Sequence, residues 1–185
     1  MKTPSPNKAA HPPSSQIVLG VDPGLATTGW GIVERKGLEL RLICFGTITS
    51  AARQELSERL RLIRSDLQKI IDEYRPVVLA IEELYFAKFA VSIAATAQAR
   101  GVILVTAAEA GIPVVEYNPR AVKMAMTGFG SADKGQMQAM VQRFFRLQEP
   151  PRPDDAADAV AIALCHLQTC RQLLPTGHLV VGGVR

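Results

Sequence analysis

The chain has 185 residues and a formal net charge of +4, and 48% of its residues are hydrophobic. This length fits one domain of ordinary size with a full hydrophobic core. No apolar run approaches the ~18 residues that a membrane-spanning helix needs, and the N-terminus lacks the apolar segment of a signal peptide. We therefore expect a soluble, cytoplasmic protein without contact to a membrane.

The chain opens with a polar segment that is followed by strand patterns. Residues 1–15 are rich in Pro, Ser and Lys and show no periodicity, so we expect a disordered N-terminal extension. A turn is expected at 36–37. Three apolar runs predict strands that together form an antiparallel meander: 16–21, 30–33 and 40–49.

The next segment combines a helix with a buried strand. In 56–74, apolar side chains recur at spacings of three and four, which predicts an amphipathic helix. Arg75 precedes Pro76, and this pair ends the helix because a proline disfavours helical geometry in the residue before it. The apolar run 76–81 predicts another strand. A strand, a helix and a buried strand in this order predict a crossover with parallel pairing.

The remaining patterns are mainly helical. The Ala-rich segment 88–110 predicts a helix closed by Gly111, and its small side chains would allow close packing against a second subunit. We expect one domain over 16–173, followed by a flexible Gly-rich tail at 174–185. The other predicted elements are a strand at 112–117, a helix that begins at Asn118-Pro119, a helix after Ser131, and a last helix from about Asp154 to Leu173.

The chain contains three cysteines: Cys44, Cys165 and Cys170. Their odd number and the absence of a CxxC pair argue against a disulfide framework. Cys165, His166 and Cys170 raise the alternative of a zinc site. Positions 165 and 170 do not share a helix face, however, and no fourth ligand is evident. Reduced thiols in a cytoplasmic protein are the favoured interpretation.

Four acidic residues occupy places that folding alone does not require. Asp22 ends one buried strand and Glu82 ends another. Asp155 and Asp158 lie three apart in the first turns of an apolar helix, so they share one helix face. Simpler roles remain open: Asp22 as a turn residue, Glu82 as a solvated strand end, and Asp155 as a partner of the helix dipole. Asp154 is predicted to be the N-cap of the last helix.

Asp158 is the hardest of these residues to explain by folding alone. It lies between Ala157 and Ala159, and a buried carboxylate is costly unless it has a partner. Crowded carboxylates also repel one another, so a shared cation would be needed. Hard ions such as Mg²⁺ take carboxylate oxygens, and two such ions about 3.5–4 Å apart can promote phosphodiester hydrolysis. The acids converge if the strands that end at Asp22 and Glu82 are neighbours in one sheet.

Positive charge is concentrated between 84 and 152. This segment has eight basic and four acidic residues, so its excess equals that of the whole chain. A polyanionic partner such as DNA would explain the excess, and a solvated helical surface would explain it equally well. The basic residues are Lys88, Arg100, Arg120, Lys123, Lys134, Arg143, Arg146 and Arg152.

Four motifs, taken in order, resemble those of the RuvC-type Holliday junction resolvases. The motifs are IVLGVDPGLATTGWGIV, LAIEELYFAK, QARGVI and PDDAADAVAIA, and the match runs from about residue 17 to residue 166. The resemblance implies an α/β protein with an RNase H-like fold, in which helices flank a mixed five-stranded sheet. It also implies a homodimer that cuts two symmetric strands of a four-way DNA junction with Mg²⁺ or Mn²⁺, two ions per site, leaving ends that can be ligated.

The resemblance also assigns roles to individual residues. Asp22 would be the central metal ligand, Glu82 would hold one ion, and Asp155 and Asp158 would hold the other. Tyr85 takes the place of an aromatic residue that stacks on a base near the cut. Lys123 and Lys134 match basic positions near the scissile phosphate, and Lys134 stands at a predicted helix start, where phosphate is attracted. Lys88 and Arg120 are further DNA-binding candidates, and the RuvA–RuvB branch-migration complex is the partner that the family implies.

Three other functions remain as alternatives. The same acids would serve an RNase H-like nuclease that acts on RNA or on an RNA–DNA hybrid. The motif VDPGLATTGWG also occurs in a similar form in actin-like ATP-binding proteins, but a second phosphate loop and an adenosine pocket are not evident in the sequence. A junction-binding module without catalysis is the third alternative, and the intact set of acids argues against it.

Overall fold

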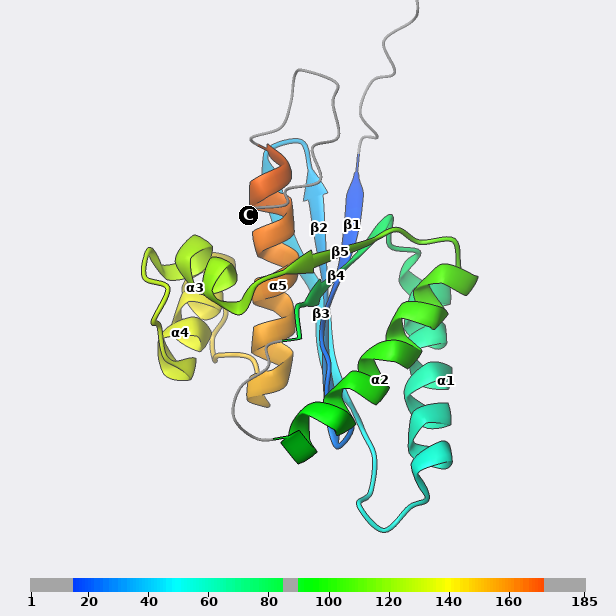
Figure 1. Ribbon diagram of the computed structural model, residues 1–185. Coiled ribbons are helices and arrows are strands. Elements are labelled where there is room, and N and C mark those ends of the chain that lie inside the picture. The colour runs from blue at the N-terminus through cyan, green and yellow to red at the C-terminus, as the bar shows by residue number, and fades with distance from the viewer. Residues whose placement is uncertain (1–14, 85–89, 172–185) are drawn as a thin grey trace, which may run out of the picture.

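The computed structural model describes residues 15–84 and 90–171 (Figure 1). Their centre is a five-stranded sheet with the order β3-β2-β1-β4-β5. The pairs β1–β2 and β2–β3 are antiparallel, and β1–β4 and β4–β5 are parallel, which confirms the predicted mixed sheet. The strands are β1 (Gln16–Asp22), β2 (Thr27–Lys36), β3 (Glu39–Thr49), β4 (Val78–Glu82) and β5 (Val114–Tyr117). Several predictions fall outside the described residues: the extension at 1–15 apart from Ser15, the residues Tyr85 and Lys88, and the tail at 174–185.

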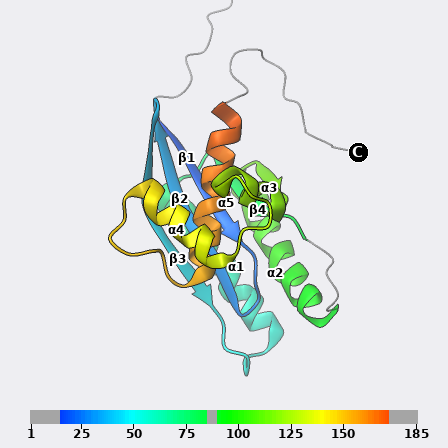
Figure 2. The ribbon, with the colours of Figure 1, turned by 90° about the vertical axis from the view of Figure 1, so that its left-hand side faces the viewer.

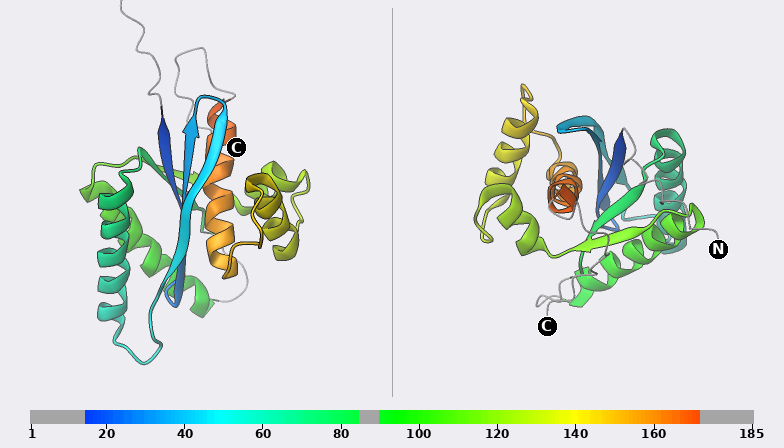
Figure 3. Two further views of the ribbon diagram at one scale, coloured as in Figure 1. Left: turned by 180° about the vertical axis from the view of Figure 1, so that it is seen from behind. Right: turned by 90° about the horizontal axis from the view of Figure 1, so that it is seen from above.

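Helices cover both faces of the sheet. The helices α1 and α2 lie on one face, while α5 lies on the other, between the sheet and the pair α3 and α4 (Figure 3). Figure 2 views the molecule from the side of α3 and α4. None of the helices in the described ranges is long and apolar enough to cross a membrane. Their bounds are α1 (Leu56–Tyr74), α2 (Ala90–Glu109), α3 (Pro119–Thr127), α4 (Lys134–Phe145) and α5 (Asp154–Arg171).

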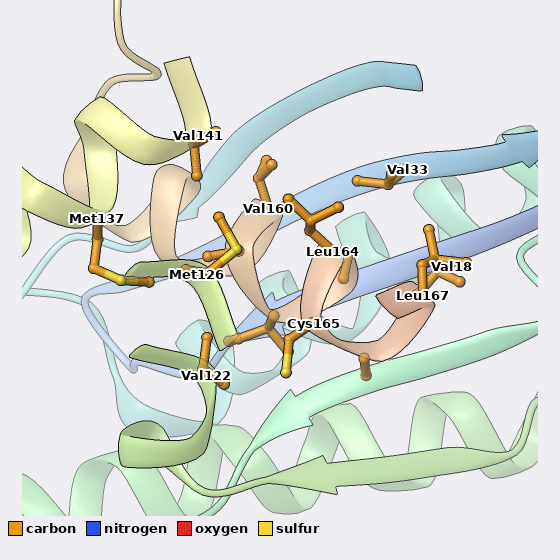
Figure 4. Packing of buried hydrophobic residues seen from close by; sticks show 14 of the residues in the cluster. Val18, Val33, Val122, Met126, Met137, Val141, Val160, Leu164, Cys165 and Leu167 are labelled. Carbon is orange, nitrogen blue, oxygen red and sulfur yellow. The ribbon is translucent and has the colours of Figure 1, made fainter. Parts of the chain in front are cut away.

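The core consists of two clusters, one on each face of the sheet. Strand β1 contributes to both, because alternate side chains of a strand point to opposite faces. Leu19 packs with Ile63 of α1 and Ile103 of α2. On the other face, Val18 packs in one cluster with Leu167 of α5 (Figure 4). The second cluster surrounds α5, which explains why that helix is apolar almost all round.

Helix α5 lies unusually close to the sheet. A Cβ atom placed on Gly29 would overlap the carbonyl oxygen of Asp155, and one placed on Gly20 would overlap the carbonyl oxygen of Ala159. Glycine is the residue that permits such a close approach between backbones. The two glycines, on β2 and β1, therefore fix how near the acidic end of α5 lies to the ends of the strands.

Several predicted boundaries differ from those observed. Strand β2 begins at Thr27, earlier than the predicted start at residue 30, because Thr27, Thr28 and Gly29 lack the apolar pattern although all three pair with β3. The prediction that Asp154 is an N-cap was wrong: it is the first residue of α5. Its carboxylate instead accepts a hydrogen bond from the Gln138 side chain of α4.

Candidate active site

Two neighbouring strands bring Asp22 and Glu82 together. Asp22 is the last residue of β1, and Glu82 is the last residue of β4. The strands run parallel, with Val21 opposite Ile81. Each acid therefore follows one member of a matched pair, and both lie at the same edge of the sheet. This is the arrangement on which the predicted convergence depended.

Helix α5 brings the other two acids to this edge. Its backbone at Asp155 contacts Gly29, which pairs with Asp22 across β1 and β2. Asp158 follows three residues later, so it lies on the same helix face. Its neighbours Ala157 and Ala159 are fully buried, and the Asp158 side chain is half-buried. The N-terminal turns of α5 thus present both carboxylates toward the ends of β1 and β4.

Electrostatic coupling shows that the acids form one group. The pKa of the Asp22 carboxyl is raised to about 8, first because burial disfavours its charged form and then because other carboxylates lie close to it. In order of their influence, these carboxylates are Glu82, Asp158 and Asp155. A hydrogen bond between Asp22 and Glu82 raises the pKa of Asp22 and lowers that of Glu82. The pair formed by Asp22 and Glu82 therefore keeps a proton at a higher pH than an isolated carboxyl group would.

Two lysines oppose the negative charge of the acids. Burial raises the pKa values of Glu82 and Asp158, while the positive charges of Lys123 and Lys134 lower both. Lys123 belongs to α3, and Lys134 is the first residue of α4. Both lysines were predicted site residues, and the structure brings both within electrostatic range of the acids. Lys134 also lies 4.0 Å from Asp154.

The acids suit hard divalent cations. All their donors are carboxylate oxygens, which Mg²⁺ and Mn²⁺ prefer. Within the described ranges, no three His, Cys, Asp or Glu side chains form a ready-made site for one ion. Carboxylates can shift one another's pKa values over distances too long for them to share one ion, so this absence agrees with the electrostatic coupling of the acids. Mg²⁺ is commonly bound by one or two protein carboxylates, with waters and substrate phosphates completing its shell. The residues present therefore fit such an ion.

The start of α4 carries a side-chain cap. We expected its backbone N–H groups to attract phosphate, and one of them, the N–H of Gln136, already donates a hydrogen bond to the carboxylate of Asp133. The Gln136 side chain in turn accepts one from the N–H of Asp133, which completes a capping box. For the other N–H groups the expectation stays a prediction. The side chain of Lys134, which is 69% exposed, remains the basic group at this position.

Arg100 is a structural residue of the site that the sequence analysis did not assign. Its guanidinium lies 2.6 Å from the carboxylate of Glu116 on β5, and its Nε donates to the carbonyl of Glu82 at 3.4 Å. The side chain is 11% exposed. Arg100 thus ties α2 to the ends of β4 and β5. Its place in the motif QARGVI was the available signal.

Neither Arg120 nor His166 is among the groups that shift the pKa values of the acids. The exposed Arg120 lies on α3, against the turn at Gly130. His166 is buried, and its Nδ1 forms a hydrogen bond with the hydroxyl of Tyr117 at 2.8 Å. Burial lowers the pKa of His166. This residue, considered above as a zinc ligand, is therefore part of the core behind β5.

Known sequences resemble this chain over most of its length. A family model described as crossover junction endodeoxyribonuclease RuvC matches residues 18–166. The protein of that name from Endomicrobium trichonymphae is 52% identical over 154 residues, which cover 83% of this chain and 81% of that protein. The one from Syntrophomonas wolfei is 49% identical over 154 residues, covering 83% and 90%.

Solved structures resemble the fold. The structure of T. thermophilus RuvC in complex with a Holliday junction substrate has a TM-score of 0.80 and 35% sequence identity, covering 85% of this chain and 96% of that chain. The yeast mitochondrial Holliday junction resolvase Ydc2 has a TM-score of 0.60 and 12% identity, covering 86% of this chain and 85% of that chain. The second likeness bears on the fold alone. Together they confirm the predicted RNase H-like α/β architecture.

Proposed function

Because the chain belongs to the RuvC family of crossover junction endodeoxyribonucleases, we propose that its clustered carboxylates bind the metal ions with which it cuts four-way DNA junctions. These carboxylates are Asp22, Glu82, Asp155 and Asp158. Paired, symmetric nicks would resolve Holliday junctions in recombination and repair. The observation that carries the proposal is the meeting of these acids at one edge of the sheet, where the parallel strands β1 and β4 end and the backbone of α5 at Asp155 contacts Gly29, the partner of Asp22.

Each carboxylate has a position in this proposal. The charges of Glu82, Asp158 and Asp155 all act on Asp22, so we propose that Asp22 would help to hold both ions. Glu82 would serve one ion, and the two acids of α5 would serve the other. Two Mg²⁺ or Mn²⁺ ions would activate a water molecule and stabilise the leaving oxygen of the phosphodiester. The protein would hold the carboxylate oxygens in place, and the Asp22 carboxyl would lose its proton when the ions bind.

The lysines beside the acids favour a phosphate group as the substrate. Lys123 and Lys134 supply positive charge that would oppose the charge of a DNA backbone. Arg120 would extend this surface along α3. For Tyr85 and Lys88, a contact with DNA remains a proposal from the sequence. Phosphate contacts made by the lysines and Arg120 would position the strand without reading its bases.

The surface of α2 favours a homodimer. Five exposed positions recur at spacings of four and three, and none of them is charged: Ala94, Gln98, Gly101, Val105 and Ala108. Such a spacing forms one stripe along a helix, and small side chains let two helices approach closely. We propose that a second copy of the chain covers this stripe, so that two active sites face the two symmetric strands. A RuvA–RuvB motor would deliver the junction, and the reaction would take place in the cytoplasm.

A cleavage assay tests the function. A labelled four-way junction, a linear duplex and an RNA–DNA hybrid would each be incubated with the protein and Mg²⁺, with and without a chelator. We expect paired symmetric nicks in the junction, and we expect them to disappear when the chelator is present. Preferred cleavage of the hybrid would instead support a ribonuclease. Junction cleavage that continues without divalent ions would reject the proposed chemistry.

A further inference from the structure

The turn between α3 and α4 presents an aromatic side chain to solvent. Phe129 is 72% exposed, whereas Val122 and Met126 of the preceding helix are 5% exposed and belong to the core. Exposing a phenylalanine forgoes the free energy that its burial would provide. A single exposed apolar residue is common on protein surfaces, so the neighbours of Phe129 decide whether it has a role.

The turn is held by hydrogen bonds on both sides of Phe129. Its N–H donates to the hydroxyl oxygen of Thr127 at 3.1 Å, and its carbonyl accepts from the N–H of Ala132 at 3.3 Å. The Thr127 hydroxyl also lies 2.8 Å from the carbonyl of Lys123 and 3.0 Å from that of Phe129, and it donates its one proton to one of them. Gly128 adopts a left-handed conformation, with φ of 79°, as the C-cap of α3. The backbone at Phe129 is therefore held in place, so binding of a ligand to its ring would cost little free energy for ordering the turn.

Positive charge surrounds this turn. Lys123 lies before it and Lys134 after it, and both act on the carboxylates of Glu82 and Asp158. The side chain of Arg120 packs beneath the turn: a Cβ atom placed on Gly130 would lie 2.7 Å from its Cγ. The turn thus joins the two lysines that flank the acids, and it stands beside the place proposed for the scissile phosphate.

We propose that Phe129 stacks on a nucleobase of the junction strand close to the cut. An aromatic ring among cations is the usual surface for unpaired bases, because the ring takes the base while the cations take the phosphates. A second copy of this chain is a poorer occupant, since it would bring the same three cations face to face. The inference rests on the proposed function, because it takes junction DNA as the substrate.

Binding of a four-way junction to the full-length protein tests this inference, with chelator present to prevent cleavage. We expect Phe129→Ala to weaken binding about tenfold, within the range expected for loss of one stacked base. Phe129→Trp should retain the affinity. A set of junctions would carry the fluorescent base 2-aminopurine at successive positions around the cut. At one of these positions, the fluorescence of the complex should differ between the wild type and Phe129→Ala. Because Phe129 is exposed, both variants should melt at the wild-type temperature.

Phe144→Ala is the matched control. Phe144 is 41% exposed and lines a shallow pocket with Arg35 and Leu38, at the opposite end of the sheet from Asp22. This variant should bind the junction as the wild type does. Unchanged binding by Phe129→Ala, or equal losses in the two variants, would overturn the inference. A Phe129→Ala protein with altered oligomeric mass would overturn it too, because Phe129 would then belong to a protein interface. Cleavage by the wild type with Mg²⁺, measured in parallel, tests the proposed function separately.

Discussion

The two faces of the sheet are covered in different ways. Helix α1 packs large aliphatic side chains such as Ile63 and Leu67 against the sheet, and its outer surface is polar. Helix α5 is buried over most of 156–167, and it closely approaches the sheet at glycines and alanines, such as Gly29 and Ala159. The first arrangement buries a large apolar area. In the second arrangement, small side chains let the backbone of α5 approach the strands closely. This face carries two of the acids. Both faces bury a hydrophobic cluster, but only the α5 face also carries acids of the site, so a change in packing should disturb the site mainly on that face.

Removal of one carboxylate should have the largest effect on activity. We expect Asp22→Asn to lower junction cleavage by more than about 100-fold, since mutation of residues that merely support metal ligands already costs 10–100-fold. Junction binding should remain nearly unchanged, because the basic surface is intact. Cleavage rates and binding constants measured on the same preparation check this. A variant that cleaves at the normal rate would show that Asp22 is not a ligand.

A methyl group between α5 and the sheet should affect both stability and activity. Gly29→Ala would force the backbone at Asp155 away from β2. Overpacking of this kind typically costs about 1–3 kcal/mol, and a shift of about 1 Å at a site can lower its activity 100-fold. We expect a lower melting temperature and cleavage reduced more than tenfold at temperatures where the variant is folded.

Gly135→Ala is the control for this substitution. Its Cβ atom would meet only the carboxylate of Asp133, at 3.4 Å, and an alanine favours the helix α4. We expect unchanged or slightly increased stability. Equal losses in Gly29→Ala and Gly135→Ala would mean that the close approach of α5 has no special role.

The pH dependence of stability should reveal the buried acids when metal is absent. The folded protein holds the proton of Asp22 up to about pH 8, whereas an ordinary aspartate releases it near pH 3.8. Between these values the folded state binds more protons than the unfolded state. The contribution of Asp22 to the free energy of unfolding therefore falls as pH rises. It is fully present below pH 3.8 and is lost as pH rises through about 8.

Chemical denaturation with chelator, over pH 5 to 8.5, measures this effect. The difference between wild type and Asp22→Asn isolates it from the titration of His166, whose pKa is lowered by burial. We expect the wild type to lose stability relative to the variant as pH rises. Mg²⁺ should stabilise the wild type more at pH 8 than at pH 5, because the ions replace a proton. A difference that does not vary with pH would show that Asp22 is not buried among charges.

The smallest effect is expected on the opposite face. Ile63→Val removes one methylene from a fully buried side chain and should cost about 0.5–1.5 kcal/mol of stability. Cleavage by the folded variant should equal that of the wild type. If cleavage fell as it does in Gly29→Ala, the two faces would not be separable.

Much of this structure could be predicted from the sequence where the pattern is regular. Helix α1 was predicted at its observed bounds, because its apolar residues are strictly periodic and a proline follows it. The acids at the ends of β1 and β4 were predicted to converge, since parallel neighbours end at one edge of the sheet. The electrostatic coupling of Asp22 supports that prediction.

Features that depend on tertiary contacts could not be predicted. Nothing in the sequence around Gly29 indicates that the backbone of α5 lies against this residue. Asp133 and Asp154 both precede or begin helices, and the sequence did not show which one caps its helix and which one contacts a neighbouring helix. The pairing of Arg100 with Glu116 joins residues on separate elements. In each case the contact joins residues on different elements of the structure, and a local sequence pattern does not reveal such a contact.

Anomalous diffraction from crystals soaked in Mn²⁺ would locate the proposed ions. We expect difference peaks among Asp22, Glu82, Asp155 and Asp158, with Mn²⁺ bound to their carboxylate oxygens. The peaks should be lost in crystals of Asp22→Asn. Strong peaks elsewhere on the protein, with none among these four side chains at saturating Mn²⁺, would contradict this expectation.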